Sequence, residues 1–232
     1  MDIHGADIAG IEGKIIRFIA TNEERRKGVT LLGLASKVVR EGLLRAAKAI
    51  ETLDGNWGNI LDNQGYTIQL SPSETPKLSA SLDLPLAIML LYASIMQNLE
   101  SIAEKEERLQ EQLDSDDKKK RAKTKEKLLE EMAALVEQRK RILKYKKRLS
   151  SNPHKYLLLG SLNIVNGELR ATEHGMLGMI AAAKPGFVVI VPEESEIHGA
   201  IVKSANKKIK VFKAKDLQEV WNIILDVSKP RE

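Results

Sequence analysis

The stretch Thr67-Ile-Gln-Leu-Ser-Pro-Ser-Glu-Thr-Pro-Lys-Leu-Ser-Ala-Ser-Leu-Asp-Leu-Pro85 decides the fold that this sequence predicts. Its first residues alternate between apolar and polar as in a half-buried strand. Prolines then make Ser71–Ser79 an irregular loop. Asp83 and Pro85 open a helix, because an acidic residue and a proline both favour a first helical turn. The apolar run Leu84–Met96 is shorter than the ~18 residues of a membrane span, so it predicts a buried helix.

The heptad spacing that follows this run predicts a long helical hairpin. Apolar residues recur every three or four positions over Ile95–Leu113 and again over Leu128–Leu149, on either side of a polar turn at Asp114–Asp117. This pattern is typical of an antiparallel coiled coil. Glu106 and Arg139 interrupt the apolar seam. We therefore expect a thin hairpin that projects into solvent.

The sequence on both sides of the hairpin predicts a mixed α/β body, because strand and helix patterns alternate there. Before the hairpin we expect a strand at 8–21, an antiparallel partner at Gly28–Leu32, and a helix with Ser36 as its N-cap. After the hairpin, an Asn-Gly turn predicts that the strands Tyr156–Val165 and Glu168–Thr172 pair. The remaining predictions are a strand buried on both faces at Phe187–Val191, a strand at Lys208–Phe212 and a last helix capped by Asp216.

These patterns divide the chain into three parts. We expect an α/β body formed by residues 1–97 and 152–227, an inserted hairpin at 98–151, and a tail or linker at 228–232.

The positive charge of the chain is concentrated in the hairpin. The net charge is +5, and residues 100–148 hold 16 Lys and Arg against 12 Asp and Glu. The rest of the chain is nearly balanced, with 21 basic and 20 acidic residues. Any acidic partner is therefore expected at the hairpin rather than at the body.

Composition and motifs exclude several classes of site and compartment. The chain has no cysteine, which excludes disulfides and thiolate metal sites and suits a reducing cytoplasm. Neither a signal peptide nor a membrane span is predicted. No Walker A motif occurs, so we expect no nucleotide or other cofactor in this chain. The four histidines lie far apart without metal-ligand spacing, which favours ordinary loop histidines over a metal site.

Four segments in order resemble the magnesium-chelatase-like ComM family. Residues 67–87 resemble its strand, proline-bearing loop and Phe-Asp-Leu-Pro-Ile-Ala helix start. The helix that begins near Gly33, the Gly160–Arg170 hairpin and the strand ending at Pro192 resemble further family segments. The resemblance implies the fold of the Lon proteolytic domain, shared with the second domain of a small-subunit ribosomal protein. It also implies an AAA+ ATPase module in cis or in trans. The insertion of Leu99–Ser151 departs from the family.

The same resemblance bears on peptidase activity. Lon-type proteases use a serine nucleophile and a lysine base, and their positions are similar to Asp83 and Leu177 here. A carboxylate in place of the serine and a leucine in place of the lysine cannot perform that acyl transfer. We therefore expect no enzyme activity, and read Asp83 as a helix-start residue. Ser79 or Ser81 with Lys184 is the alternative dyad.

Two basic runs in the hairpin are candidates for nucleic-acid contacts. We expect Lys118–Lys125 to lie beside acidic residues around Glu104–Glu111 of the first helix, which would neutralise it. The second run contains no acidic residue and is expected opposite the apolar Leu84–Met96, so its charge would be uncompensated. The candidate phosphate-binding residues of this second run are Arg139, Lys140, Arg141, Lys144, Lys147 and Arg148. The alternative is that these side chains cover apolar surface on a solvated helix.

Taken together, the sequence favours a non-catalytic accessory domain of a ComM-like or magnesium-chelatase-like AAA+ protein that assists DNA engagement or ring assembly. The first alternative is a protein-interaction scaffold in which the hairpin pairs with another helix or self-associates. The second is a degenerate peptidase. Nucleic acid, an AAA+ ATPase module and a second copy of the chain are the expected partners, and a membrane is not.

Overall fold

The protein is described from a computed structural model. The described residues are 2–9, 12–22, 28–53, 65–74, 77, 79–114, 122–150, 152–172, 185–195 and 209–227. The strands are β1 (Asp2–Ala9), β2 (Glu12–Asn22), β3 (Gly28–Leu32), β4 (Gly65–Ser71), β5 (Lys155–Leu158), β6 (Ser161–Leu162), β7 (Leu169–Arg170), β8 (Phe187–Pro192) and β9 (Lys210–Ala214). The helices are α1 (Lys37–Thr52), the short 3-10 turn η1 (Ala80–Leu82), α3 (Asp83–Asp114), α4 (Ala122–Ser150) and α7 (Leu217–Val227).

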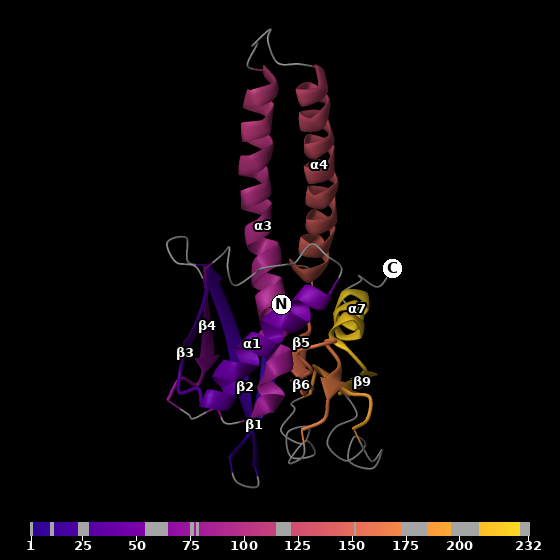
Figure 1. Cartoon of the computed structure of the whole chain (residues 1–232). Coiled ribbons are helices and arrows are strands. Elements are labelled where there is room, and N and C mark those ends of the chain that lie inside the picture. The colour runs from indigo at the N-terminus through magenta and orange to yellow at the C-terminus, as the bar shows by residue number, and fades with distance from the viewer. Residues whose placement is uncertain are drawn as a thin grey trace.

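The body is a mixed sheet with the strand order β3-β4-β2-β1-β5-β8-β9, and it confirms the predicted mixed α/β class. Strand β2 runs antiparallel to both of its neighbours, whereas every other neighbouring pair is parallel. The remaining strands, β6 and β7, form a separate two-stranded ribbon. Figure 1 shows the sheet and its helices at one end of the molecule and two long helices, α3 and α4, rising from it.

Strand pairing in the N-terminal half differs from the prediction in two ways. The single strand expected at 8–21 is wrong, because β1 and β2 are two strands that pair antiparallel, with Ala9 opposite Glu12. The expected antiparallel pairing of Gly28–Leu32 with the first strand is also wrong. Among the described strands, β3 pairs with β4 alone, and the two run parallel because the crossover helix α1 connects them. A short connection suggested a hairpin, but β4 occupies the place beside β2.

The ribbon after the hairpin also differs from the prediction. The strand expected at Tyr156–Val165 is broken at Gly160, whose φ of +138° is open to glycine but strained for other residues. Strand β5 therefore joins the main sheet, while β6 turns away to pair with β7. The loop between β6 and β7 is longer than the predicted Asn-Gly turn. A hydrogen bond from the Gly167 N–H to the Asn163 carbonyl, at 3.0 Å, closes it over five residues.

Helix starts follow the predicted capping chemistry. The hydroxyl of Ser36 accepts from the Val39 N–H at 3.4 Å at the start of α1. The Asp216 carboxylate accepts from the Glu219 N–H at 2.8 Å and caps α7. Both contacts satisfy an amide group that has no partner within its own helix.

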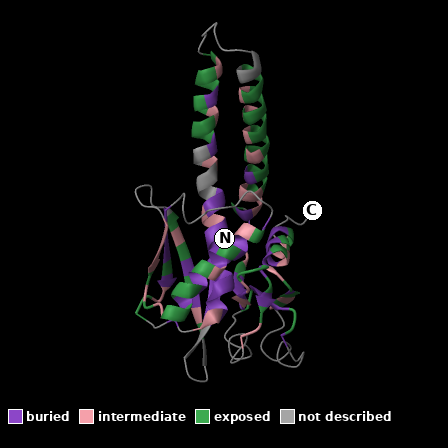
Figure 2. Ribbon diagram, viewed as in Figure 1, coloured by how far each residue is buried: buried purple, intermediate pink, exposed green. Residues whose placement is uncertain are grey.

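The core lies on both faces of the central strands. All six residues of β8 are buried, as predicted for a strand covered on both sides. Val188 and Ile190 belong to the large cluster that also contains the buried faces of α1, α3 and α7. Val189 and Val191 belong to a smaller cluster on the opposite face. Figure 2 shows the buried residues gathered in the body and exposed residues along the two long helices.

The helices α3 and α4 form an antiparallel pair that projects from the body, hereafter the arm (Figure 1). Helix α3 is continuous over 32 residues, or about 48 Å, and passes without a break through the expected boundary near residue 98. Four seam residues of the arm are buried: Ile102, Leu109, Ile142 and Leu149. At its root, Tyr145 of α4 makes an edge-to-face contact with Trp221 of α7, with ring centroids 6.0 Å apart.

Candidate functional site

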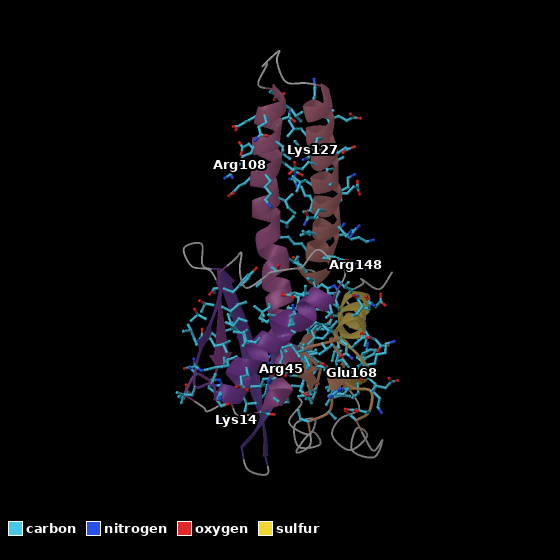
Figure 3. The ribbon with its side chains drawn as sticks, viewed as in Figure 1. Lys14, Arg45, Arg108, Lys127, Arg148 and Glu168 are labelled. Atoms are coloured by element: carbon cyan, nitrogen blue, oxygen red, sulfur yellow. The ribbon has the colours of Figure 1, made fainter. Side chains whose placement is uncertain are left out.

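Asp83, which corresponds to the nucleophile position in the resemblance, begins α3 and is completely buried. Its carboxylate forms a bidentate ion pair with Arg45 of α1. The Arg45 Nε donates to Oδ2 at 2.7 Å, and Nη2 donates to Oδ1 at 3.0 Å. A third donor, the Leu162 N–H of β6, reaches Oδ2 at 3.3 Å. One carboxylate therefore joins two helices and the ribbon. Figure 3 labels Arg45 within the body.

The close approach of α1 to α3 depends on Gly42. A Cβ at this position would lie 2.2 Å from Oδ1 of Asp83, well inside contact distance. Gly42 is buried and lies one turn before Arg45, on the face of α1 that meets the start of α3. A glycine inside a helix ordinarily costs stability, so its presence here is explained by the space that the carboxylate needs.

Burial is the largest influence on the pKa of Asp83, whereas the hydrogen bonds of the pair are the largest influence on the pKa of Arg45. Burial raises the pKa of the Asp83 carboxyl above its ordinary value, and the Arg45 guanidinium and the Leu162 N–H offset this only in part. The pKa of Arg45 is raised, chiefly by its hydrogen bonds to Asp83. The arrangement is that of a structural ion pair. Both carboxylate oxygens are occupied and no face of the group meets solvent.

The alternative serine nucleophiles lie just before α3 and form its entry turn. The Ser81 hydroxyl is buried and donates to the Ala6 carbonyl of β1 at 2.7 Å. The Ser79 hydroxyl donates to Ser81 Oγ at 2.9 Å, and Ser79 Oγ accepts from the Ser81 N–H at 3.1 Å. Both hydroxyls thus hold local structure. The other expected peptidase positions, Leu177 and Lys184, lie outside the described residues.

The loop that precedes this turn contains a lysine that sequence reasoning missed. Lys77 is fully buried, and its ammonium donates to the Pro72 carbonyl. Its backbone bonds to the start of α1, through Leu34 O at 2.8 Å and the Ser36 N–H at 3.0 Å. A lysine is rarely buried unless it is paired. Its spacing in the sequence carries no signal of this role.

The candidate phosphate-binding residues lie along the half of α4 that is nearer the body. Arg139, Lys140, Arg141, Lys144 and Lys147 are exposed and Arg148 is partly exposed. Figure 3 labels Arg148 at the root of the arm, close to the body. The structure therefore places the six candidates on one helix.

The predicted register of the arm is wrong at Arg139, and so is the expectation that Arg139 has no acidic partner. Arg139 Nη1 lies 2.7 Å from Glu106 Oε2 on α3, whereas the prediction placed it opposite Leu84–Met96. Lys140 pairs with Glu137 on its own helix, with the charged atoms 2.7 Å apart. Arg141, Lys147 and Arg148 also take part in interactions.

The other basic run, Lys118–Lys125, was predicted to lie beside Glu104–Glu111, whose acidic side chains would neutralise it. For Glu106 this prediction is wrong, because Glu106 pairs with Arg139 instead. Lys125 lies near the start of α4 and therefore near the tip of the arm. Lys118–Arg121 lie outside the described residues.

A groove of about 800 Å³ runs along one side of the arm. Its apolar lining comes from Ala103 of α3 and from Met132, Val136 and Leu143 of α4. Charged residues rim it, acidic on α3 and basic on α4. The sequence contained a signal for this groove, because apolar residues recur seven positions apart along α4 outside the predicted seam.

No group of three metal-ligating side chains occurs within the described residues. His4 lies 3.3 Å from the Asp2 carboxylate, and burial lowers its pKa despite that neighbour. His154 makes an edge contact with Tyr156, and His174 and His198 lie outside the described part of the chain. No helix of the described residues combines the length and apolarity needed to cross a bilayer.

Comparison with known proteins gives one family similarity. Residues 20–123 match the profile of the family described as subunit ChlI of Mg-chelatase. The matched segment covers a little under half of the chain, from β2 to the beginning of α4, and includes Gly42, Arg45 and Asp83. It supports the magnesium-chelatase-like part of the resemblance. A search of curated proteins finds no match.

Proposed function

We propose that this chain is a non-catalytic accessory domain of a magnesium-chelatase-like, AAA+-associated protein. The observation that carries the proposal is the buried ion pair of Asp83 with Arg45, at the position that the ComM resemblance aligns with a Lon-type nucleophile. A nucleophile must reach its substrate, whereas this carboxylate has no exposed surface and donors on both oxygens. Its role in the proposal is to hold α1, α3 and β6 together.

The Lon-like fold and the AAA+ partner are parts of the same proposal. The order β3, α1, β4, followed by a loop and a buried helix start, supports the Lon-like reading of the body. The match to subunit ChlI of Mg-chelatase, an AAA+-associated family, fits an ATPase module in cis or in trans and an oligomeric assembly. Fold similarity alone does not assign an activity, so the site carries the functional argument.

Serine-directed labelling tests the non-catalytic assignment. The intact chain is treated with a fluorophosphonate, and covalent adducts are sought by intact-mass spectrometry. We expect no adduct, because the hydroxyls of Ser79 and Ser81 are engaged in the entry turn of α3. Labelling that is abolished by Ser81→Ala or Ser79→Ala would overturn the proposal and restore a peptidase reading.

The accessory role that we propose is contact with nucleic acid through the root of the arm. Residues 139–148 contain seven Lys and Arg and no acidic residue. The phosphate contacts are assigned to exposed residues of this stretch that share one face of α4, above all Lys144 and Lys147. Cationic side chains along one helix face bind phosphates without reading sequence.

Fluorescence anisotropy with single-stranded and forked DNA tests this contact. Binding should weaken steeply between about 50 and 200 mM salt, because bound phosphates release counterions. The variant Lys144→Glu/Lys147→Glu should lose most of the binding and reduce the salt slope by about two. The matched control, Lys125→Glu/Lys127→Glu, reverses two exposed lysines near the tip of α4 and should retain binding. Absence of binding at low salt, or equal loss in both variants, would refute the contact.

A specific observation favours a second candidate function, a protein-interaction scaffold. The groove on the arm has an apolar floor, which phosphate binding does not use. Apolar helix packing withstands salt whereas phosphate contacts do not, so the same salt series separates the two functions.

A further inference from the structure

One flank of the arm carries a regular row of exposed apolar side chains. Leu129, Val136 and Leu143 are 52%, 37% and 45% exposed, and they lie seven residues apart on α4. Each follows a residue of the inner seam, such as Ile142, which is 4% exposed. With the seam at heptad positions a and d, this row occupies position e. A spacing of seven keeps all three on one side of the helix.

The opposite flank of the arm is polar. In an antiparallel helix pair the e positions of both helices border one flank and the g positions border the other. The described g positions are Lys105, Gln112, Glu131, Gln138 and Tyr145. The tyrosine packs against Trp221 at the root of the arm, so the free length of this flank is polar. Only the e flank is both apolar and unoccupied by the body in the described residues.

This asymmetry distinguishes the arm from a self-sufficient two-helix coiled coil. Two helices need apolar residues only at a and d, whereas bundles of three or four helices add position e or g. The groove of about 800 Å³ lies on the e flank, with Ala103, Met132, Val136 and Leu143 in its lining. The arm therefore presents the side of a larger bundle.

We propose that this flank binds the same flank of a second copy of the chain, so that two arms form a four-helix bundle. The charges at the rim select this occupant. Glu106 of α3 and Arg139 of α4 pair with each other within the arm. The other charges at the rim are Glu107 on the α3 edge and Lys140 on the α4 edge, where Lys140 lies beside Glu137 of its own helix. A surface with one acidic edge and one basic edge is complementary to its own copy when a two-fold axis brings opposite edges together.

The internal register determines the direction of that axis. Glu106 and Arg139 are in contact at 2.7 Å, so Glu107 and Lys140 lie at the same height on the arm. A two-fold axis along the arm places α3 of each copy against α4 of the other, with Glu107 facing Lys140 of the second copy. A two-fold axis perpendicular to the arm would instead place α3 against α3, so that the two acidic edges would face each other. The charges therefore favour arms that point in the same direction, with every neighbouring helix antiparallel.

Sedimentation velocity of the full chain over a range of concentrations tests association. The wild type should form a dimer. The variant Val136→Glu/Leu143→Glu should weaken dimerisation at least about a hundredfold, because each copy would bury two carboxylates in the apolar interface. The control Ala134→Glu also places an acid on an exposed position of α4, but outside the groove, and should leave dimerisation unchanged. Circular dichroism verifies that all variants remain helical.

Cysteine cross-linking tests the arrangement, and the chain is suited to it because it has no cysteine of its own. Ala103 of one copy should face Leu143 of the other. Mixing the Ala103→Cys chain with the Leu143→Cys chain under oxidation should yield covalent dimers, and either variant alone should yield few. A wild type that stays monomeric, or equal weakening by the Ala134→Glu control, would overturn the proposal. Efficient cross-linking of either variant alone would overturn the two-fold axis along the arm.

Discussion

Replacing Arg45 with methionine isolates the energetic role of the buried ion pair. The side chain of Asp83 has no exposed surface, and that of Arg45 is 26% exposed. Methionine preserves much of the apolar volume of the arginine stem but leaves the carboxylate with the Leu162 N–H as its described donor. Removing one partner of a buried pair costs about 3–5 kcal/mol, because the other charge is left uncompensated.

The partial exposure of Arg45 places the expected loss at the lower end of that range. Water can reach the arginine side of the pair, so we expect Arg45→Met to lower the free energy of unfolding by about 3 kcal/mol. For a chain of this length, this corresponds to a fall in Tm of about 6–12 °C. Chemical denaturation and thermal melting followed by circular dichroism at neutral pH measure both quantities.

The stability lost in Arg45→Met should depend on pH, and the raised pKa of Asp83 determines the direction of that dependence. The pKa of Asp83 is raised in the folded protein, so the stabilisation linked to its proton is present below the unfolded pKa near 4. That stabilisation is lost as the pH rises through the folded pKa. Removing Arg45 raises this pKa further, because the guanidinium lowers it in the wild type. The penalty of Arg45→Met should therefore shrink as the pH is lowered toward 4.

Two comparisons would refute the reasoning. Lys48 lies one turn along α1, is 58% exposed and pairs with Glu51, so Lys48→Met should cost less than about 0.5 kcal/mol. The double variant Arg45→Met/Asp83→Leu removes both charges and should regain much of the lost stability. If Arg45→Met behaves like Lys48→Met, or if the double variant is less stable than the single one, the buried charge is not what the pair controls.

Three further predictions concern α1, the arm and a buried tyrosine. Gly42→Ala should destabilise the protein in urea unfolding, because the new Cβ would lie 2.2 Å from Oδ1 of Asp83. We expect this although alanine favours helices by about 1 kcal/mol relative to glycine. A stabilised variant would contradict the close packing. Ile142→Ala should lower the free energy of unfolding by about 2–4 kcal/mol, because Ile142 is buried in the seam. The neighbouring Leu143 is 45% exposed, so Leu143→Ala should lower it by under about 1 kcal/mol at concentrations where the chain is monomeric. Equal losses would contradict the seam. Burial raises the pKa of Tyr66 to about 12, so one tyrosine should ionise only near that pH in an ultraviolet titration, and stability linked to its proton should be lost between about pH 10 and 12. Tyr66→Phe should remove that late step, and its persistence would contradict the assignment.

The sequence by itself determined the local features of this protein. Ser36 and Asp216 predict helix starts because a side-chain oxygen two or three residues before a free amide can cap it in any context. The continuous apolar run at Phe187–Val191 predicts a strand buried on both faces because no polar side chain within it can face water. Heptad spacing predicted two long helices on either side of a polar turn for the same reason, since the pattern is contained in the segment.

Only the tertiary structure decided which segments meet. The sequence places a short connection before β3, but β4 lies between β3 and β2 because the crossover helix α1 returns the chain in parallel. The register of the arm depends on how α3 and α4 lie against each other over their described lengths, and it sets Glu106 against Arg139. Asp83 is an ordinary helix-start residue in the sequence. It is a buried structural carboxylate in the fold, because Gly42 admits it and Arg45, 38 residues earlier, pairs with it. Such contacts depend on backbone positions far apart along the chain, which no local pattern specifies.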